Sequence, residues 1–144
     1  MKKYGWLLML MIFASLLTGC ATDKATEVVE ISERMFITQC NDVYINTDEY
    51  TNKTIVLEGM YYEYTDPKTN QVHTYVIRNG PGCCANDGIV GFEILFEGDK
   101  PVPNDWIRVT GKVEKLDNNE LETIVLRLDQ IEIKAERGQE TVLN

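Results

Sequence analysis

Residues 53–65 read KTIVLEGMYYEYT, and this stretch decides the fold class. Its side chains alternate between two sets, which is the period of a β-strand and not of a helix. The first set is Ile55, Leu57, Gly59 and Tyr61, and the second is Thr54, Val56, Glu58 and Met60. The stretch therefore predicts a long strand.

The same period of two continues along the rest of the chain. We expect strands at about 53–65, 72–79, 89–97, 106–116 and 121–133, separated by segments rich in Gly, Pro, Asn and Asp. Gly59 and Gly111 fall in the middle of the two long strands, the first and the fourth, where a glycine permits a sharp bend. The pattern favours a mainly β fold, a five-stranded OB-like barrel, with an open sandwich as the alternative.

A helix is expected before the strands. Between Glu27 and Tyr44, apolar residues recur at spacings of three and four, which is typical of one face of an amphipathic helix. Residues 46–49 read NTDE and predict one further helical turn. The segment between the third and fourth strands is too short for a helix, so we expect the N-terminal helix to plug the barrel.

The first twenty residues have the pattern of a lipoprotein signal peptide. Lys2 and Lys3 form a basic head, residues 6–17 are apolar, and residues 17–20 read LTGC. The apolar run is shorter than the roughly 20 residues of a membrane-spanning helix, and small residues before a cysteine mark a processing site. We expect cleavage before Cys20, a palmitate-type lipid anchor on that cysteine, and a location on the extracytoplasmic face of the cell membrane.

This interpretation divides the chain into a signal peptide (1–19), a tether (20–27), an OB-like domain (28–137) and a tail (138–144). The whole chain has a net charge of −9, and loss of the signal peptide leaves 12 basic against 23 acidic residues, a charge of −11. Nucleic acid is therefore not an expected partner, because binding it requires Lys and Arg to neutralise phosphates. Acyl chains on Cys20 would supply the membrane affinity.

Residues 78–88 read RNGPGCCANDG, a glycine-rich loop with two adjacent cysteines. Four interpretations of the cysteines stay open. Cys83 and Cys84 could bridge each other in a strained ring, or one of them could bridge Cys40. The three thiolates, with Asp87 as a fourth ligand, could hold zinc or another soft metal ion. The cysteines could also be inert core residues.

Enzymatic chemistry has little support in the sequence. His73 is the only histidine, and it opens the second strand, far along that strand from the cysteine loop. No nucleophile and base stand in a recognisable pattern, so we expect a protein that is not an enzyme. Arg78, beside the loop, could hold Asp87 or an anion, or form a surface salt bridge.

Several segments resemble the soluble domain of a two-component permease family of unknown function. The matching residues are Met35-Phe36, Tyr50, Lys53, Glu58-Gly59-Met60, Tyr75 to Arg78, Cys83 to Asp87 and Asp105 to Gly111. The most specific part is the grouping of an arginine, two adjacent cysteines and an aspartate.

The resemblance implies an OB-like fold, a role without catalysis, a permease partner and a link to metal uptake, because relatives look like members of zinc-responsive gene sets. It also implies a site made of Arg78, Cys83, Cys84 and Asp87. The lipobox is a departure from the family's pattern. We therefore expect a lipid-anchored binding module for metal handling or redox sensing beside a transport system. The alternative is a structural or protein-interaction lipoprotein.

Overall fold

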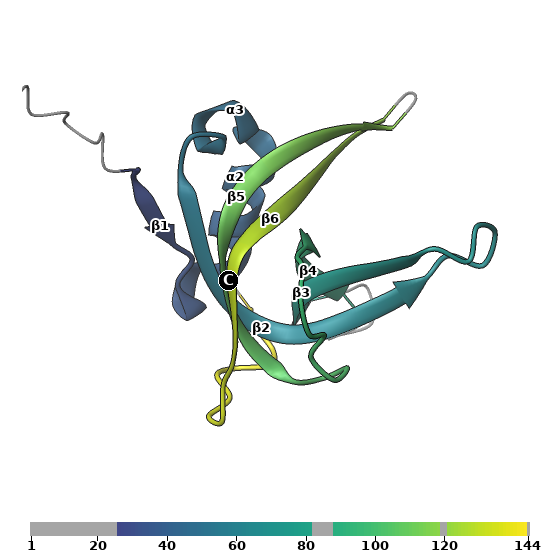
Figure 1. Ribbon diagram of the computed structural model, residues 1–144. Coiled ribbons are helices and arrows are strands. Elements are labelled where there is room, and N and C mark those ends of the chain that lie inside the picture. The colour runs from purple at the N-terminus through teal and green to yellow at the C-terminus, as the bar shows by residue number, and fades with distance from the viewer. Residues whose placement is uncertain (1–25, 82–87, 119–120, 144) are drawn as a thin grey trace, which may run out of the picture.

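A computed structural model describes residues 26–81, 88–118 and 121–143 of the chain (Figure 1). A short strand and a helical segment precede five longer strands. The elements are β1 (Val28–Glu30), η1 (Glu33–Met35), α2 (Phe36–Ile45), α3 (Thr47–Tyr50), β2 (Thr54–Thr65), β3 (Val72–Gly80), β4 (Gly88–Leu95), β5 (Trp106–Asn118) and β6 (Leu121–Ile133).

The five long strands form a closed barrel. They pair in the order β2, β3, β4, β6 and β5, and β2 also pairs with β5, which closes the ring. The β4–β6 pair is parallel, and the other pairs of the ring are antiparallel. This is the Greek-key order of an OB-like barrel, so the predicted fold class is confirmed.

The two mid-strand glycines of the long strands β2 and β5 lie where neighbouring strands come too close for a side chain. A Cβ atom on Gly59 would lie 2.6 Å from the Ile77 carbonyl oxygen, and one on Gly111 would lie 2.4 Å from that of Arg127. The β5–β6 register also shifts between Thr110 and Gly111. Both glycines therefore permit the long strands to curve around the barrel, as the sequence predicted.

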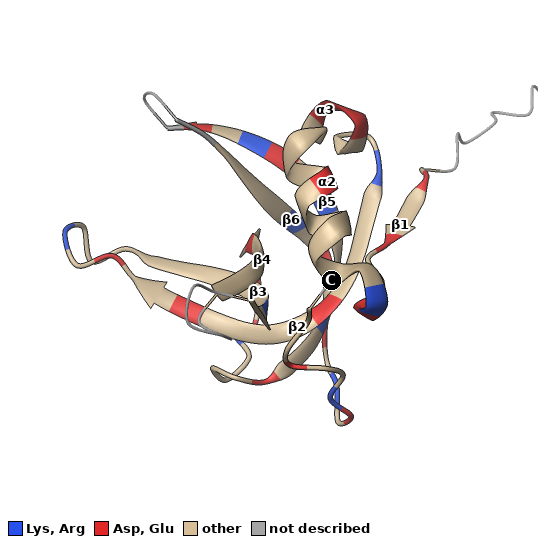
Figure 2. Cartoon of the chain, turned by 180° about the vertical axis from the view of Figure 1, so that it is seen from behind, with Lys and Arg blue, Asp and Glu red and all other residues tan. Residues whose placement is uncertain are grey.

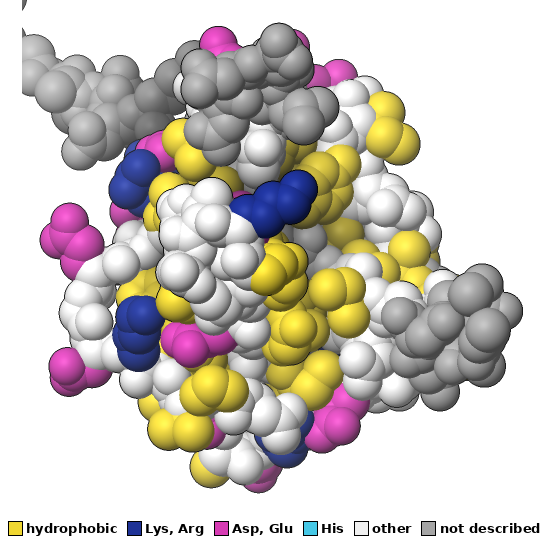
Figure 3. All heavy atoms as spheres, turned by 90° about the vertical axis from the view of Figure 1, so that its right-hand side faces the viewer, with side chains coloured by type: hydrophobic (Ala, Val, Ile, Leu, Met, Phe, Trp, Pro, Cys, Tyr) yellow, Lys and Arg dark blue, Asp and Glu magenta, His cyan; other side chains and the backbone are white. Residues whose placement is uncertain are grey.

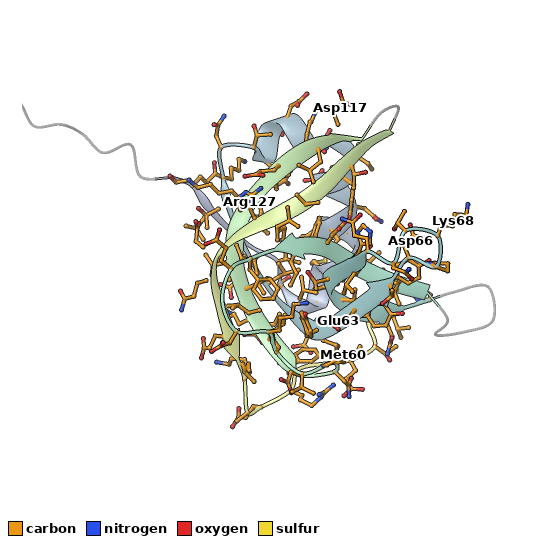
Figure 4. The ribbon with its side chains drawn as sticks, turned by 45° about the vertical axis from the view of Figure 1, so that its right-hand side comes forward. Met60, Glu63, Asp66, Lys68, Asp117 and Arg127 are labelled. Carbon is orange, nitrogen blue, oxygen red and sulfur yellow. The ribbon has the colours of Figure 1, made fainter. Side chains whose placement is uncertain are left out.

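The turn between β2 and β3 follows the chemistry of its residues. The Asp66 carboxylate accepts a hydrogen bond of 2.7 Å from the Lys68 amide, and Asn70 has the left-handed φ of 56°. Aspartate and asparagine favour these two conformations. Figure 4 shows Asp66 and Lys68 at the end of this hairpin and Asp117 near the end of the β5–β6 hairpin.

The predicted helix from Glu27 to Tyr44 is wrong in its first part. Val28–Glu30 is a strand that runs parallel to β2, with Val29 opposite Ile55, and the Ile31 amide donates to the Val56 carbonyl at 2.8 Å. β-Branched valines favour an extended backbone, and the edge of β2 offers hydrogen bonds that helix formation would leave unused. Glu33–Met35 is a 3₁₀ turn, and the α-helix begins only at Phe36.

From Phe36 onward the helical pattern holds. Phe36, Cys40 and Val43 are almost fully enclosed and belong to the same apolar cluster as Leu57 and Val76 of the barrel. One face of α2 thus completes the core, as expected for a plug. The further turn predicted from residues 46–49 is α3.

The residues after Arg137, expected as a tail, pack against the end of β3. The Asn79 amide donates to the Glu140 carbonyl, and the Val142 amide donates to the Asn79 carbonyl, both at 2.8 Å. Val142 is only 2% exposed and lies in the main apolar cluster. Residues 139–142 therefore form part of the folded unit.

Acidic and basic side chains are spread over the outside of the barrel, with acidic residues gathered on α3 (Figure 2). Within the described part of the chain, no helix is long and apolar enough to cross a bilayer.

Candidate ligand-binding site

Most of the predicted cysteine site lies outside the described residues. This is true of Cys83, Cys84 and Asp87, and also of the lipid-anchor residue Cys20. The structure places only Cys40 and Arg78 from the predicted set. Neither of them has a free, solvent-facing polar group.

Cys40 is a free cysteine with no exposed surface. Burial raises the pKa of its thiol to about 12, an effect that the positive charge of Arg78 opposes only in part. A reactive thiol must be an accessible thiolate, so Cys40 is poorly suited to reaction with a solvent-borne partner. Among the described residues, no three His, Cys, Asp or Glu side chains gather as a metal site.

Arg78 is not a surface residue, contrary to the interpretation as a surface salt bridge. It is 2% exposed, and its guanidinium carbon lies 4.7 Å from the centre of the Phe36 ring and 4.9 Å from that of Trp106. A planar guanidinium stacks well between two aromatic faces. The sequence could not show this, because Phe36 and Trp106 are about 70 positions apart.

The polar atoms of Arg78 join three separate segments. Nε donates to the Glu58 carbonyl at 2.8 Å, Nη1 donates to the Gln139 carbonyl at 3.0 Å, and Nη1 lies 3.4 Å from Glu33 Oε1. The Glu33 carboxylate also accepts a hydrogen bond from the Gln139 amide. Arg78 therefore holds η1, β2 and the C-terminal segment together, and its guanidinium is already engaged.

A groove opens where β4 and β6 begin to pair. Their parallel pairing covers only Glu93–Leu95 and Val125–Arg127, so the strands diverge before it, and the end of α2 fills part of the gap. We name this hollow of about 480 Å³ the seam groove. It is lined by Tyr44, Thr47, Tyr75, Glu93, Lys115, Thr123 and Ile124.

Two aromatic rings and one carboxylate are among the side chains that line the seam groove. Tyr75 of β3 lies directly opposite Glu93 of β4, so both side chains share the outer face of the sheet. Tyr62 of β2 continues this row, with its ring centre 6.4 Å from that of Tyr75. When the right-hand side of Figure 1 faces the viewer, hydrophobic side chains gather along the middle of the visible face (Figure 3).

The Tyr44 hydroxyl donates to the Gly91 carbonyl at 2.8 Å, and its ring stacks on Phe92 at a centre distance of 5.0 Å. Burial, followed by the nearby Cys40, Tyr75 and Glu93, raises the pKa of Tyr44 to about 12. Burial and then Glu93 also raise the pKa of Tyr75. Both tyrosines therefore stay neutral, and both feel the charge of the Glu93 carboxylate.

The charged groups of the seam groove have partners within the protein. Glu93 Oε1 lies 2.7 Å from His73 Nδ1, and the Glu93 side chain is only 16% exposed. Lys115 Nζ lies 2.7 Å from Asp48 Oδ1, on the rim formed by α3. His73, at the start of β3, therefore lies beside a carboxylate from the neighbouring strand and not beside the cysteine loop.

A larger hollow of about 810 Å³ lies between η1 and the C-terminal segment, lined by Glu33, Arg34 and residues 139–143. It contains no aromatic side chain. The seam groove is smaller but combines aromatic walls with a few polar groups, which is the usual composition of a small-molecule site.

Residues 17–140 match the family described as the DUF1980 C-terminal domain. The chain belongs to this family. No curated protein matches the chain. Among solved structures, one described as an aspartyl-tRNA synthetase from Leishmania major Friedlin is similar, with 12% identity and a TM-score of 0.40 over 89% of this chain. The match covers 25% of that protein, so the DUF1980 C-terminal domain spans about a quarter of its length.

Sequence reasoning did not find the seam groove in this DUF1980 C-terminal domain. Tyr44, Tyr75 and Glu93 come from three elements, and no spacing along the chain connects them. The signal available in the sequence was the group of tyrosines, Tyr75 among them, on the first two strands. The fold alone brings it beside Glu93.

Proposed function

We propose that this DUF1980 C-terminal domain is a lipid-anchored, extracytoplasmic binding module that serves a transport system and takes a small ligand in the seam groove. The groove is the observation that carries the proposal. Its volume of about 480 Å³ falls in the range of about 300–1,000 Å³ that is typical of small-molecule sites, and aromatic side chains line it beside a few polar groups. No catalytic step is part of this proposal.

Two features of the sequence support the cellular part of the proposal. The LTGC sequence at residues 17–20 supports export and attachment through Cys20. The resemblance to the soluble domain of a two-component permease supports a membrane transporter as partner. The adjacent Cys83 and Cys84, with Asp87, would be the place where such a module handles a soft metal ion or senses redox state.

One purification tests the anchor and the metal proposal together. The full chain is expressed in a bacterium and purified from membranes in detergent without a chelator. We expect an intact mass that corresponds to a chain beginning at Cys20 with acyl groups attached. We also expect bound zinc that is lost in the Cys83→Ser, Cys84→Ser double variant and kept in Cys40→Ala, because Cys40 is sealed in the core.

An unmodified chain that begins at Met1 would rule out the lipid anchor. Equal zinc content in the wild type and the double variant would rule out metal handling by the loop. Loss of zinc in Cys40→Ala would instead indicate that Cys40 is one of the zinc ligands.

The binding role of the seam groove has its own test. Choline, N-acetylglucosamine and inorganic phosphate represent cationic, neutral and anionic ligands, and each is titrated at millimolar concentration while ¹H–¹⁵N NMR spectra are recorded. We expect at least one of them to shift the amides around Tyr75 and Glu93 selectively. A groove that responds to none of the three would refute the proposed binding role.

A further inference from the structure

We infer that the ligand of the seam groove carries a compact organic ammonium group, which would sit against the rings of Tyr44 and Tyr75 and beside the carboxylate of Glu93. This inference rests on the proposed binding role and names the chemical class of its ligand. Aromatic faces attract ammonium ions through the negative potential above the ring, and a nearby carboxylate adds to that attraction.

The arrangement of the three side chains suits an ammonium ion. Tyr75 and Glu93 are opposite each other on neighbouring strands, so their Cβ atoms lie within roughly 4.5–5.5 Å of each other. Tyr44 reaches the same strand from α2, where its hydroxyl donates to the Gly91 carbonyl and its ring stacks on Phe92. Aromatic rings from two elements and a single carboxylate thus line the same groove.

The hydrogen bonds already made in the seam groove argue against a sugar as the ligand. The Tyr44 hydroxyl donates to Gly91, the Thr47 hydroxyl is 3.0 Å from both the Val43 and Tyr44 carbonyls, and Glu93 contacts His73. A sugar needs several unused donors and acceptors, since each of its hydroxyls must be satisfied when buried. An ammonium group with methyl substituents needs only aromatic faces and negative potential.

Charge argues against an anion. Glu93 lies within the groove, Asp48 lies on its rim, and the whole chain has a net charge of −9. Lys115 is the cationic residue that lines the groove, and its ammonium is 2.7 Å from Asp48. An anion would meet the field of Glu93, whereas a cation is attracted by both the local and the overall charge.

The test compares choline with 3,3-dimethylbutan-1-ol, which has the same shape with a carbon in place of the charged nitrogen. NMR titration of the protein should give amide shifts around Tyr44, Tyr75 and Glu93 with choline, and binding at least about tenfold weaker with the alcohol. Equal affinities for the two compounds would overturn the inference, because shape alone would then explain binding.

Two variants and a matched control make the test specific. Glu93→Gln and Tyr75→Leu should each weaken choline binding by about tenfold, whereas Tyr75→Phe should keep it, because phenylalanine retains the aromatic face. Glu136→Gln removes the same charge from an exposed position outside the groove and should have little effect. Circular dichroism checks that each variant folds, and unchanged binding in both Glu93→Gln and Tyr75→Leu would refute the assignment.

The outcomes separate this inference from the proposed function. If N-acetylglucosamine or phosphate shifts the groove amides and choline does not, the ammonium inference is wrong and the binding module stands. If none of the three compounds shifts them, both are wrong.

Discussion

Replacing Arg78 with alanine should lower the free energy of unfolding by about 3–5 kcal/mol. The substitution removes a buried guanidinium that lies between the rings of Phe36 and Trp106 and donates to two backbone carbonyls. Those carbonyls lose their partners, and the C-terminal segment loses one of its bonds to the barrel. Chemical denaturation followed by circular dichroism measures the change.

Arg127 provides the matched control. It lies on β6, is 56% exposed and pairs with Glu114 at 2.7 Å (Figure 4). Arg127→Ala should cost no more than about 1 kcal/mol, because exposed ion pairs contribute little. Arg78→Lys should fall between the two, since lysine keeps the charge and loses the planar stacking. If Arg78→Ala and Arg127→Ala lower the free energy of unfolding by similar amounts, the buried Arg78 contributes no more to stability than an exposed arginine.

Replacing Phe36 with alanine should lower the free energy of unfolding by about 3–5 kcal/mol. Phe36 has no exposed surface and sits in the main core cluster, where its ring also covers the guanidinium of Arg78. Truncation would leave a cavity between α2 and the barrel. The midpoint of chemical denaturation measures the effect.

Ile45 lies on the same helix and is 79% exposed, so Ile45→Ala should change stability by less than about 0.5 kcal/mol. If Phe36→Ala lowers the free energy of unfolding only slightly, the barrel is stable without the packing of α2 against it. A large effect for both variants would contradict burial of Phe36 as the cause, because alanine has the higher helix propensity and Ile45 is exposed.

The five long strands could be predicted because each alternates with a period of two and ends at turn residues. The residues 66–70, with Asp66 and Asn70, are an example of a turn that the sequence marks clearly. Gly59 and Gly111 also marked their bends, because few residue types tolerate the close approach found there. Local chemistry was sufficient for these features.

Other features depend on contacts between distant segments. Val28–Glu30 fits either a helical or an extended pattern, and only the adjacent edge of β2 decides between them. Arg78 is a buried residue only because Phe36 and Trp106 meet around it. The seam groove likewise depends on how β4, β6 and α2 meet. No pattern within one segment contains this information.

The packing of residues 139–142 has a consequence for how the protein folds as it is made. Val142 completes a cluster that includes Phe36, and the Gln139 backbone bonds to both Glu33 and Arg78. These partners are more than 60 positions apart, so the core remains incomplete until residue 142 has left the ribosome. The complete core therefore forms only late in synthesis, after nearly the whole domain has been made.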